Sequence, residues 1–227
     1  QIGKKMPAEI ILIGGASVLV NYGFRNMTTD IDALIQAASV IKDIINHVGD
    51  HYGLPNGWLN QDFIRTESYS SKLSGFSEYY RTYSNVLTVR TVRAEYLIAM
   101  KLRSGRQYKS DLSDVLGILA EHEKAGTSIS LENIQQAVID LYGDWNTLPK
   151  PSRNFIHNAM KNGRFCELYA QTRIEESEIK DLLVHFEKDY PGAAKEENVN
   201  EIAENLQRHN SRASILAKLR TIKNQTD

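Results

Sequence analysis

The sequence has 227 residues and nearly balanced charge, with 27 lysines and arginines against 28 aspartates and glutamates. At 41% hydrophobic and 24% charged residues, the composition is that of an ordinary globular protein with one domain or two small ones. A net charge of −1 excludes a generally basic nucleic-acid binder, and no apolar run approaches the ~20 residues that span a bilayer. We therefore expect no membrane partner, and the single cysteine favours the cytoplasm.

The first predicted element is a buried strand, Glu9–Ile13, whose continuous aliphatic residues are typical of a sheet core. Gly14 and Gly15 follow as a turn, and Ala16–Tyr22 as a short helix. The start of a helix presents unpaired N–H groups and partial positive charge, so this unit predicts a phosphate site. Ser17 is predicted to contact a phosphate oxygen, and the alternative is a bond within its own helix.

Two aspartates open the next predicted strand, Asp30–Ile35. Asp30 and Asp32 are two residues apart, so both carboxylates project from one face while Ile31 points into the core. Neighbouring carboxylates repel each other unless a cation lies between them, and Mg²⁺ prefers such oxygen ligands. The pair predicts a magnesium site for a nucleoside triphosphate, with a two-metal site as one form of it. The alternative is an exposed acidic strand end.

The elements that follow predict a small mixed sheet and its cover. Val40–His51 has the apolar spacing of a helix that covers one face of the sheet. The polar stretch 58–80 is expected to be a loop over the site, and Tyr80–Tyr83 and Val86–Val92 to be strands joined by Ser84 and Asn85. The alternation within Val86–Val92 favours a half-buried strand at the sheet edge.

The chain is predicted to be helical from Ala94 onward. Ser110 and Ser130 are the expected N-caps of helices that end near Gly126 and Tyr142, and helical spacing recurs at 151–161, 175–188, 199–207 and 211–223. The composition changes near residue 126, so we predict an α/β domain at 1–125 and a helical domain at 126–227. The fold class is therefore α/β (α+β): a small mixed-sheet core followed by an all-helical C-terminal half. Cys166 is expected to be a buried thiol.

Positive charges gather between residues 81 and 109, where one acid, Glu95, faces a set of basic residues. Such a cluster is suited to a triphosphate or an RNA backbone, and the alternative is that its members only solvate exposed faces. The set consists of Arg81, Arg90, Arg93, Lys101, Arg103, Arg106 and Lys109.

Together, Gly-Gly-x-Ser, a short helix and Asp-Ile-Asp resemble the nucleotidyltransferase fold, the superfamily of DNA polymerase β and the aminoglycoside nucleotidyltransferases. Further segments are similar to the bacterial branch that holds AbiEii-type toxins and related uncharacterised nucleotidyltransferases. These segments are Arg25 with Thr28-Thr29, Trp58-Leu59-Asn60, Tyr96–Leu102, and Lys109–Asp114 with its two aspartates.

The resemblance implies a Mg²⁺-dependent enzyme that moves a nucleoside monophosphate from an NTP to an acceptor hydroxyl and releases pyrophosphate. It also implies that the acceptor is an RNA, such as tRNA, or a protein. It further implies that this protein is a toxin with a cognate antitoxin. Asp30 and Asp32 would hold the metal, and with Lys101 and Asp111 they would form the catalytic set. The nucleotide would be bound by Gly14, Gly15, Ser17, Arg25, Thr29 and Lys101.

One departure from the family pattern concerns the third carboxylate that active members usually carry on a later strand. The strand Val86–Val92 offers Arg90 and no acid. The residues that would substitute are Glu67, Glu78, Glu95 and Asp111, and the sequence does not choose among them. The second hypothesis for function is therefore a nucleotidyltransferase-like module that binds nucleotide or a partner protein without turnover.

Overall fold

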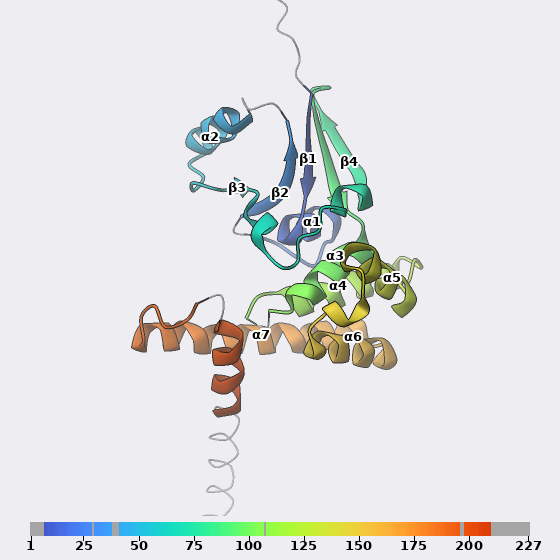
Figure 1. The fold of residues 1–227 in the computed structure, drawn as a ribbon, viewed down its shortest axis with the longest axis vertical. Coiled ribbons are helices and arrows are strands. Elements are labelled where there is room, and N and C mark those ends of the chain that lie inside the picture. Colours follow the sequence, from blue (N-terminus) through green and yellow to red (C-terminus); the bar gives the residue numbers. More distant parts are fainter. Residues whose placement is uncertain (1–6, 29, 38–40, 107, 196–197, 210–227) are drawn as a thin grey trace, which may run out of the picture.

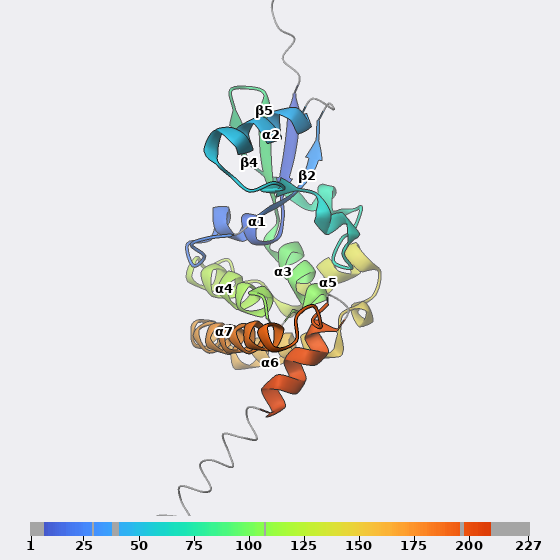
Figure 2. The same ribbon diagram turned by 90° about the vertical axis from the view of Figure 1, so that its left-hand side faces the viewer.

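The structure, a computed structural model, describes residues 7–28, 30–37, 41–106, 108–195 and 198–209. Figure 1 shows a sheet at one end of the molecule and a stack of helices below it, with α1 and α3 at the boundary. Figure 2 shows the same two layers from the side, with α4 beneath the sheet and α7 beneath α4. The predicted fold class, a small sheet core followed by helices, is confirmed.

Five strands form the sheet in the order β3-β2-β1-β5-β4. The central strand β1 runs antiparallel to β2 and parallel to β5, so the sheet is mixed as predicted. At the edges β3 pairs parallel with β2, and β4 pairs antiparallel with β5. The strand bounds are β1 Ala8–Leu12, β2 Ile31–Gln36, β3 Leu59–Asn60, β4 Ser77–Tyr83 and β5 Leu87–Val92.

The hairpin that joins β4 to β5 turns at the predicted residues. Ser84 and Asn85 have φ angles of 50° and 54°, the two positive values that a tight two-residue hairpin turn requires. The prediction that the second strand lies at the sheet edge is wrong, because β5 lies between β1 and β4. Its polar alternation has another cause: the Arg90 guanidinium donates to the Ser77 hydroxyl at 2.8 Å on the neighbouring strand.

The helix α2, Ile41–Tyr52, forms where predicted, but it is only partly buried. Gly49 is its one buried residue, and Ile44 is 50% exposed, so the predicted apolar cover over the sheet is not made at that position. Trp58 attaches the helix instead, since its indole N–H donates to the Ile45 carbonyl at 3.1 Å. The stretch predicted as a loop also contains β3 and two short 3₁₀ turns, Asp62–Arg65 and Leu73–Phe76.

The remaining helices follow the predicted order. Their bounds are α1 Gly14–Asn21, α3 Ala94–Ser104, α4 Asp111–Lys124, α5 Leu131–Tyr142, α6 Lys150–Asn162 and α7 Phe165–Asp189, with a 3₁₀ turn at Trp145–Thr147 and a last helical stretch at 199–209. Ser130 caps α5 through a capping box with Asn133, as predicted. α7 begins well before the predicted 175, and the predicted helix at 211–223 lies outside the described residues.

One hydrophobic cluster joins the sheet to the helices. It runs from Ile11 in β1 through Leu97 in α3 and Leu116 in α4 to Ile156 in α6 and Phe165 in α7. This cluster contains residues on both sides of the boundary predicted at 125/126, which stays a prediction. Cys166 is exposed, so the prediction of a buried thiol is wrong. Among the described residues, no helix combines the length and apolarity that crossing a membrane requires.

Candidate functional site

The glycine turn and the second aspartate face each other at the end of the sheet. Ile13, the last residue before α1, donates its backbone N–H to the Asp32 carbonyl at 2.9 Å, which fixes the start of the helix beside the start of β2. Gly14 has a φ of +54°, and a Cβ built there would lie 3.6 Å from the Asp32 Oδ2. The antiparallel pairing of β1 and β2 thus brings the predicted phosphate turn and the predicted metal ligand together.

Arg25 and Thr28 lie over the second glycine of the turn. A Cβ on Gly15 would lie 2.9 Å from the Arg25 Nη2 and 2.9 Å from the Thr28 Oγ1, so a side chain at this position would displace both groups. The close approach of the arginine is therefore sufficient reason for glycine here. Thr28 also donates its hydroxyl to the Asp30 carbonyl at 3.0 Å, which places the first aspartate beside the same turn.

Ser17 is buried within α1 and has no exposed surface. Its hydroxyl oxygen has no hydrogen-bond partner among the described residues, so the alternative of a bond within its own helix is not made in this structure. The proposed contact with phosphate stays a prediction. Thr29, another predicted nucleotide-binding residue, lies outside the described residues.

Burial and the neighbouring charges set the pKa of Asp32. Burial raises the pKa of Asp32, and the neighbouring Asp30 raises it further. Arg106, Lys109 and Lys101 act in the opposite direction, so their positive charges lie near this carboxylate. An aspartate whose ionisation is disfavoured by burial and by a second carboxylate fits Mg²⁺, which keeps water and phosphate oxygens as its other ligands.

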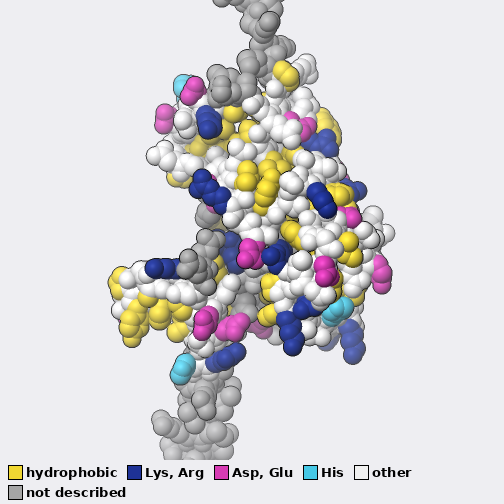
Figure 3. Space-filling model, in the orientation of Figure 1, with side chains coloured by type: hydrophobic (Ala, Val, Ile, Leu, Met, Phe, Trp, Pro, Cys, Tyr) yellow, Lys and Arg dark blue, Asp and Glu magenta, His cyan; other side chains and the backbone are white. Residues whose placement is uncertain are grey.

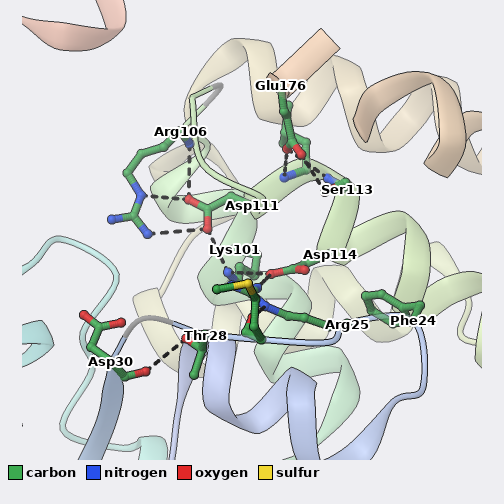
Figure 4. A network of polar contacts seen from close by, with 12 residues as sticks. Phe24, Arg25, Thr28, Asp30, Lys101, Arg106, Asp111, Ser113, Asp114 and Glu176 are labelled. Atoms are coloured by element: carbon green, nitrogen blue, oxygen red, sulfur yellow. Dashed lines mark hydrogen bonds and ion pairs between the residues drawn. The ribbon is translucent and has the colours of Figure 1, made fainter. Parts of the chain in front are cut away.

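A second group of charges, the buried ion-pair network, lies behind this pair (Figure 4). The Lys101 ammonium donates to the Asp111 carboxylate at 2.8 Å and lies 2.9 Å from that of Asp114. Arg25 pairs with Asp114, and the Arg106 Nε donates to Asp111 at 2.8 Å. Lys101 is only 7% exposed, and both aspartates are buried.

The network fixes the ionisation of its members. Burial alone would raise the pKa of Asp111, but Lys101 and Arg106 outweigh it and hold that pKa well below its usual range. Burial would likewise lower the pKa of Lys101, and the two aspartates reverse that effect. Both ammonium contacts of Lys101 are thus with protein carboxylates, and its predicted contact with a triphosphate stays a prediction. Arg25, predicted from the resemblance to bind the nucleotide, pairs with Asp114 in this structure, and its contact with nucleotide stays a prediction.

The structure sorts the predicted basic cluster into two groups. Arg90 bonds to Ser77, Arg93 stacks over Tyr96 at 4.7 Å from the ring centre, and Arg103 pairs with Glu67 at 3.1 Å. These contacts hold the fold together. Lys101, Arg106 and Lys109 are the members whose charges act on Asp32, and they come from α3 and from the connection between α3 and α4.

The strand next to Asp32 carries an amide side chain, that of Asn60. Asn60 in β3 is in parallel register with Asp32 in β2. Its side-chain oxygen accepts the Asp62 N–H at 2.8 Å, and its NH₂ donates to the Gly57 carbonyl at 3.1 Å. Within the described ranges, no three His, Cys, Asp or Glu side chains are grouped so that they could hold a metal. Because β3 has only two residues, its sequence shows no strand periodicity. The short Trp-Leu-Asn motif was the one sequence signal for Asn60.

The surface is hollowed beside these residues. Figure 3 shows a recess between the sheet part of the molecule and the protruding end of α7. The start of β2, which follows Asp30 in the chain, lies above this recess in the same orientation (Figure 1). Figure 4 shows Asp30 and Arg106 on the same side of the buried network. Asp30 is exposed and Arg106 is half-buried, so this side of the buried network faces the surface.

Comparison with protein families gives a match over residues 2–143, more than half of the chain. The matching family is described as "Nucleotidyltransferase of unknown function (DUF6036)". The comparisons found no matching curated protein and no matching solved structure.

Proposed function

This chain belongs to the DUF6036 family of nucleotidyltransferases of unknown function, and on that premise we propose that it binds a Mg²⁺–nucleoside triphosphate and transfers its nucleoside monophosphate. Asp30 and Asp32 hold the metal, and Arg106 and Lys109 face the phosphates. The acceptor is a hydroxyl on RNA or protein, and we extend the proposal, from the resemblance to AbiEii-type proteins, to a cytoplasmic toxin with a cognate antitoxin.

The observation that carries the proposal is that Gly14, at a φ of +54°, brings the start of α1 next to the Asp32 carboxylate, whose Oδ2 would lie 3.6 Å from a Cβ at this position. A helix start without side chains admits phosphate oxygens, and a carboxylate at that point admits the cation that phosphates bring. The like charge of Asp30 and the nearby charges of Arg106 and Lys109 give the site both of the components that a metal-bound triphosphate needs.

In the proposed reaction the acceptor oxygen forms a bond to the α-phosphorus while the bond from that phosphorus to the bridging oxygen breaks. Pyrophosphate leaves, and the proton of the hydroxyl passes to water. Bound Mg²⁺ supplies Lewis-acid stabilisation of charge on the phosphates. The chain itself contributes position: the aspartates orient the triphosphate, and Arg106 and Lys109 offset the negative charge that grows on pyrophosphate.

A second candidate function, nucleotide binding without turnover, is favoured by Asn60. This residue is in register with Asp32, and an amide there neither removes a proton nor adds negative charge to a second metal. The two candidate functions share the binding site. They differ only in whether the bond from the α-phosphorus to the bridging oxygen is broken.

Binding and transfer are measured separately to test the proposal. Each of the four NTPs is titrated calorimetrically with Mg²⁺ and with EDTA, and α-labelled NTPs are then incubated with total tRNA and with the protein alone. We expect Mg²⁺-dependent binding and label on RNA or protein. Binding without label supports the module, and no Mg²⁺-dependent binding of any NTP contradicts both candidates. The Asp30→Asn, Asp32→Asn double variant is the matched control.

A further inference from the structure

The first turn of α4 is capped by a residue from another helix. Ser110 stands at the predicted N-cap, but its side chain makes no capping hydrogen bond. Glu176 in α7 takes its place: one carboxylate oxygen accepts the N–H groups of Leu112 and Ser113, each at 3.1 Å. The other accepts the Ser113 hydroxyl at 2.5 Å. Figure 4 shows this carboxylate above the helix start, on the opposite side of Asp111 from Lys101.

This capping arrangement is costly compared with a local serine cap. Glu176 is only 7% exposed, and burial raises its pKa to about 7 despite the hydrogen bonds from Ser113 and Leu112. A serine at the N-cap would satisfy the same amides without burying a carboxylate. What Glu176 adds is a connection, because it ties α7 to the turn that begins with Asp111.

The connection between α3 and α4 is attached to the same helix at a second point. Tyr108 packs against a small apolar cluster that contains Ile179 and Leu183 of α7 and Ala203 of the last helical stretch. Lys109 lies between Tyr108 and the capped turn, and Arg106 bonds to Asp111, the first residue of that turn. Arg106 and Lys109, two of the three basic side chains that act on Asp32, thus lie between two attachments to α7.

We propose that Glu176 is a positioning residue for the triphosphate: by fixing the first turn of α4 it fixes Asp111, and through Asp111 it sets where Arg106 faces Asp32. This inference rests on the proposed binding of a Mg²⁺–triphosphate. It assigns the C-terminal helices a part in nucleotide affinity, although no side chain of α7 needs to touch the nucleotide.

The test compares two changes at Glu176 with one at a neighbouring acid. Glu176→Gln keeps an oxygen that accepts the two amides and loses the charge, while Glu176→Ala loses both. Glu178→Ala, at an exposed glutamate two residues along α7, is the matched control. The probe is Mg²⁺–tripolyphosphate, which carries no base, titrated calorimetrically beside Mg²⁺ alone.

We expect Glu176→Ala to weaken tripolyphosphate binding about tenfold, the effect of displacing one charge-assisted contact. Glu176→Gln should stay within about threefold of the wild type, and Mg²⁺ alone should bind all variants alike. Equal affinity in Glu176→Ala and wild type overturns the inference, as does a Glu176→Gln variant that binds as weakly as the alanine variant. A tenfold gain in Glu176→Gln also overturns it, because the glutamate would then act by repulsion.

Two further measurements keep the test decisive. If Glu176→Ala does not fold, Ser113→Ala removes one of the three contacts and should weaken binding in the same direction, and unchanged affinity there contradicts the inference. If the wild-type protein binds neither tripolyphosphate nor any NTP, the proposed function fails. Failure of this inference alone is distinguishable, because wild type and Glu176→Ala then bind equally well.

Discussion

Two pairs of aspartates lie close together in this protein and have opposite surroundings. Asp30 is exposed and Asp32 is half-buried at the start of β2, where burial and mutual repulsion raise the pKa of Asp32. Asp111 and Asp114 are buried in the first turn of α4, with Lys101 bonded between them. The second pair receives its cations from the chain, and the pKa of Asp111 falls well below its usual range.

The difference separates a site that is complete from one that is suited to a ligand. In the buried ion-pair network each carboxylate has a basic partner, so nothing further is needed for its charge to be stable. At the first pair, burial and the charge of Asp30 raise the pKa of Asp32 despite the nearby basic side chains, so added positive charge beside Asp32 would be favourable. Changes in the network should therefore affect folding, and changes at the first pair should affect binding.

The largest effect is expected when the network loses its central cation. Lys101→Met leaves Asp111 and Asp114 buried side by side with one partner each, so we expect a loss of about 3–5 kcal/mol in the free energy of unfolding. Urea denaturation followed by circular dichroism measures it. Lys124→Met, which breaks an exposed pair with Glu121, should leave the free energy of unfolding nearly unchanged, because solvent screens such pairs. Equal losses in the two variants would contradict the comparison.

The reverse result is expected at the first pair. In the Asp30→Asn, Asp32→Asn variant the repulsion disappears, so the free energy of unfolding should not fall. Its Mg²⁺-dependent affinity for NTP should fall by about 100-fold or more, equivalent to about 2.7 kcal/mol. Calorimetry measures the affinity and urea denaturation the stability. A variant that is strongly destabilised and still binds NTP with Mg²⁺ would mean that the two pairs have been assigned the wrong way round.

Glu176 should make the free energy of unfolding depend on pH. Its carboxyl has an ordinary pKa of 4.5, and burial raises that to about 7 in the folded protein. Between these values the unfolded state has released the proton while the folded state keeps it, so the folded state binds more protons and stability falls as pH rises. The stabilisation is complete below about pH 4.5 and is lost by about pH 7.

We expect this loss to be on the order of 2 kcal/mol in the wild type and absent in Glu176→Gln, which does not titrate. The measurement is the difference in unfolding free energy between the two proteins at intervals from pH 4.5 to pH 8, since other groups titrate alike in both. A constant difference over this range would show that the carboxyl titrates normally in the folded state.

Much of the region around Asp30 and Asp32 was predictable from local sequence. The strand at Glu9–Ile13 and the strand that contains Asp32 depend on residues that are adjacent in the chain, and both form within one residue of the predicted bounds. Gly14 and Gly15, predicted as a separate turn, are instead the first residues of α1, and Asp30 lies one residue before β2. Gly14 lies close to Asp32 because β1 and β2 are paired antiparallel, an arrangement that two strands joined by a short helix readily adopt.

What escaped prediction depends on contacts between distant residues. Asp114 lies in the first turn of a predicted helix, and its partner Arg25 is 89 residues away along the chain. Ser110 was a sound local cap, and it was replaced by Glu176, 63 residues from Ser113. No pattern in one sequence connects such positions. The edge assignment of β5 failed similarly, because the partner of Arg90 lies on another strand.

The smallest effect is expected at Arg106, which contacts the buried aspartate pair through Asp111 and acts on the first aspartate pair through its charge near Asp32. Its guanidinium bonds to Asp111 and lowers the pKa of Asp32. Arg106→Lys keeps the charge but loses the planar fork, so it cannot hold Asp111 and also face a phosphate. We expect nearly unchanged stability and about tenfold weaker NTP binding, equivalent to about 1.4 kcal/mol. Arg103→Lys, at an arginine that pairs with Glu67, is the matched control and should leave NTP affinity unchanged. If Arg106→Lys instead loses stability and keeps its affinity, Arg106 belongs to the buried ion-pair network alone, and Lys109 is left as the basic residue that faces the triphosphate.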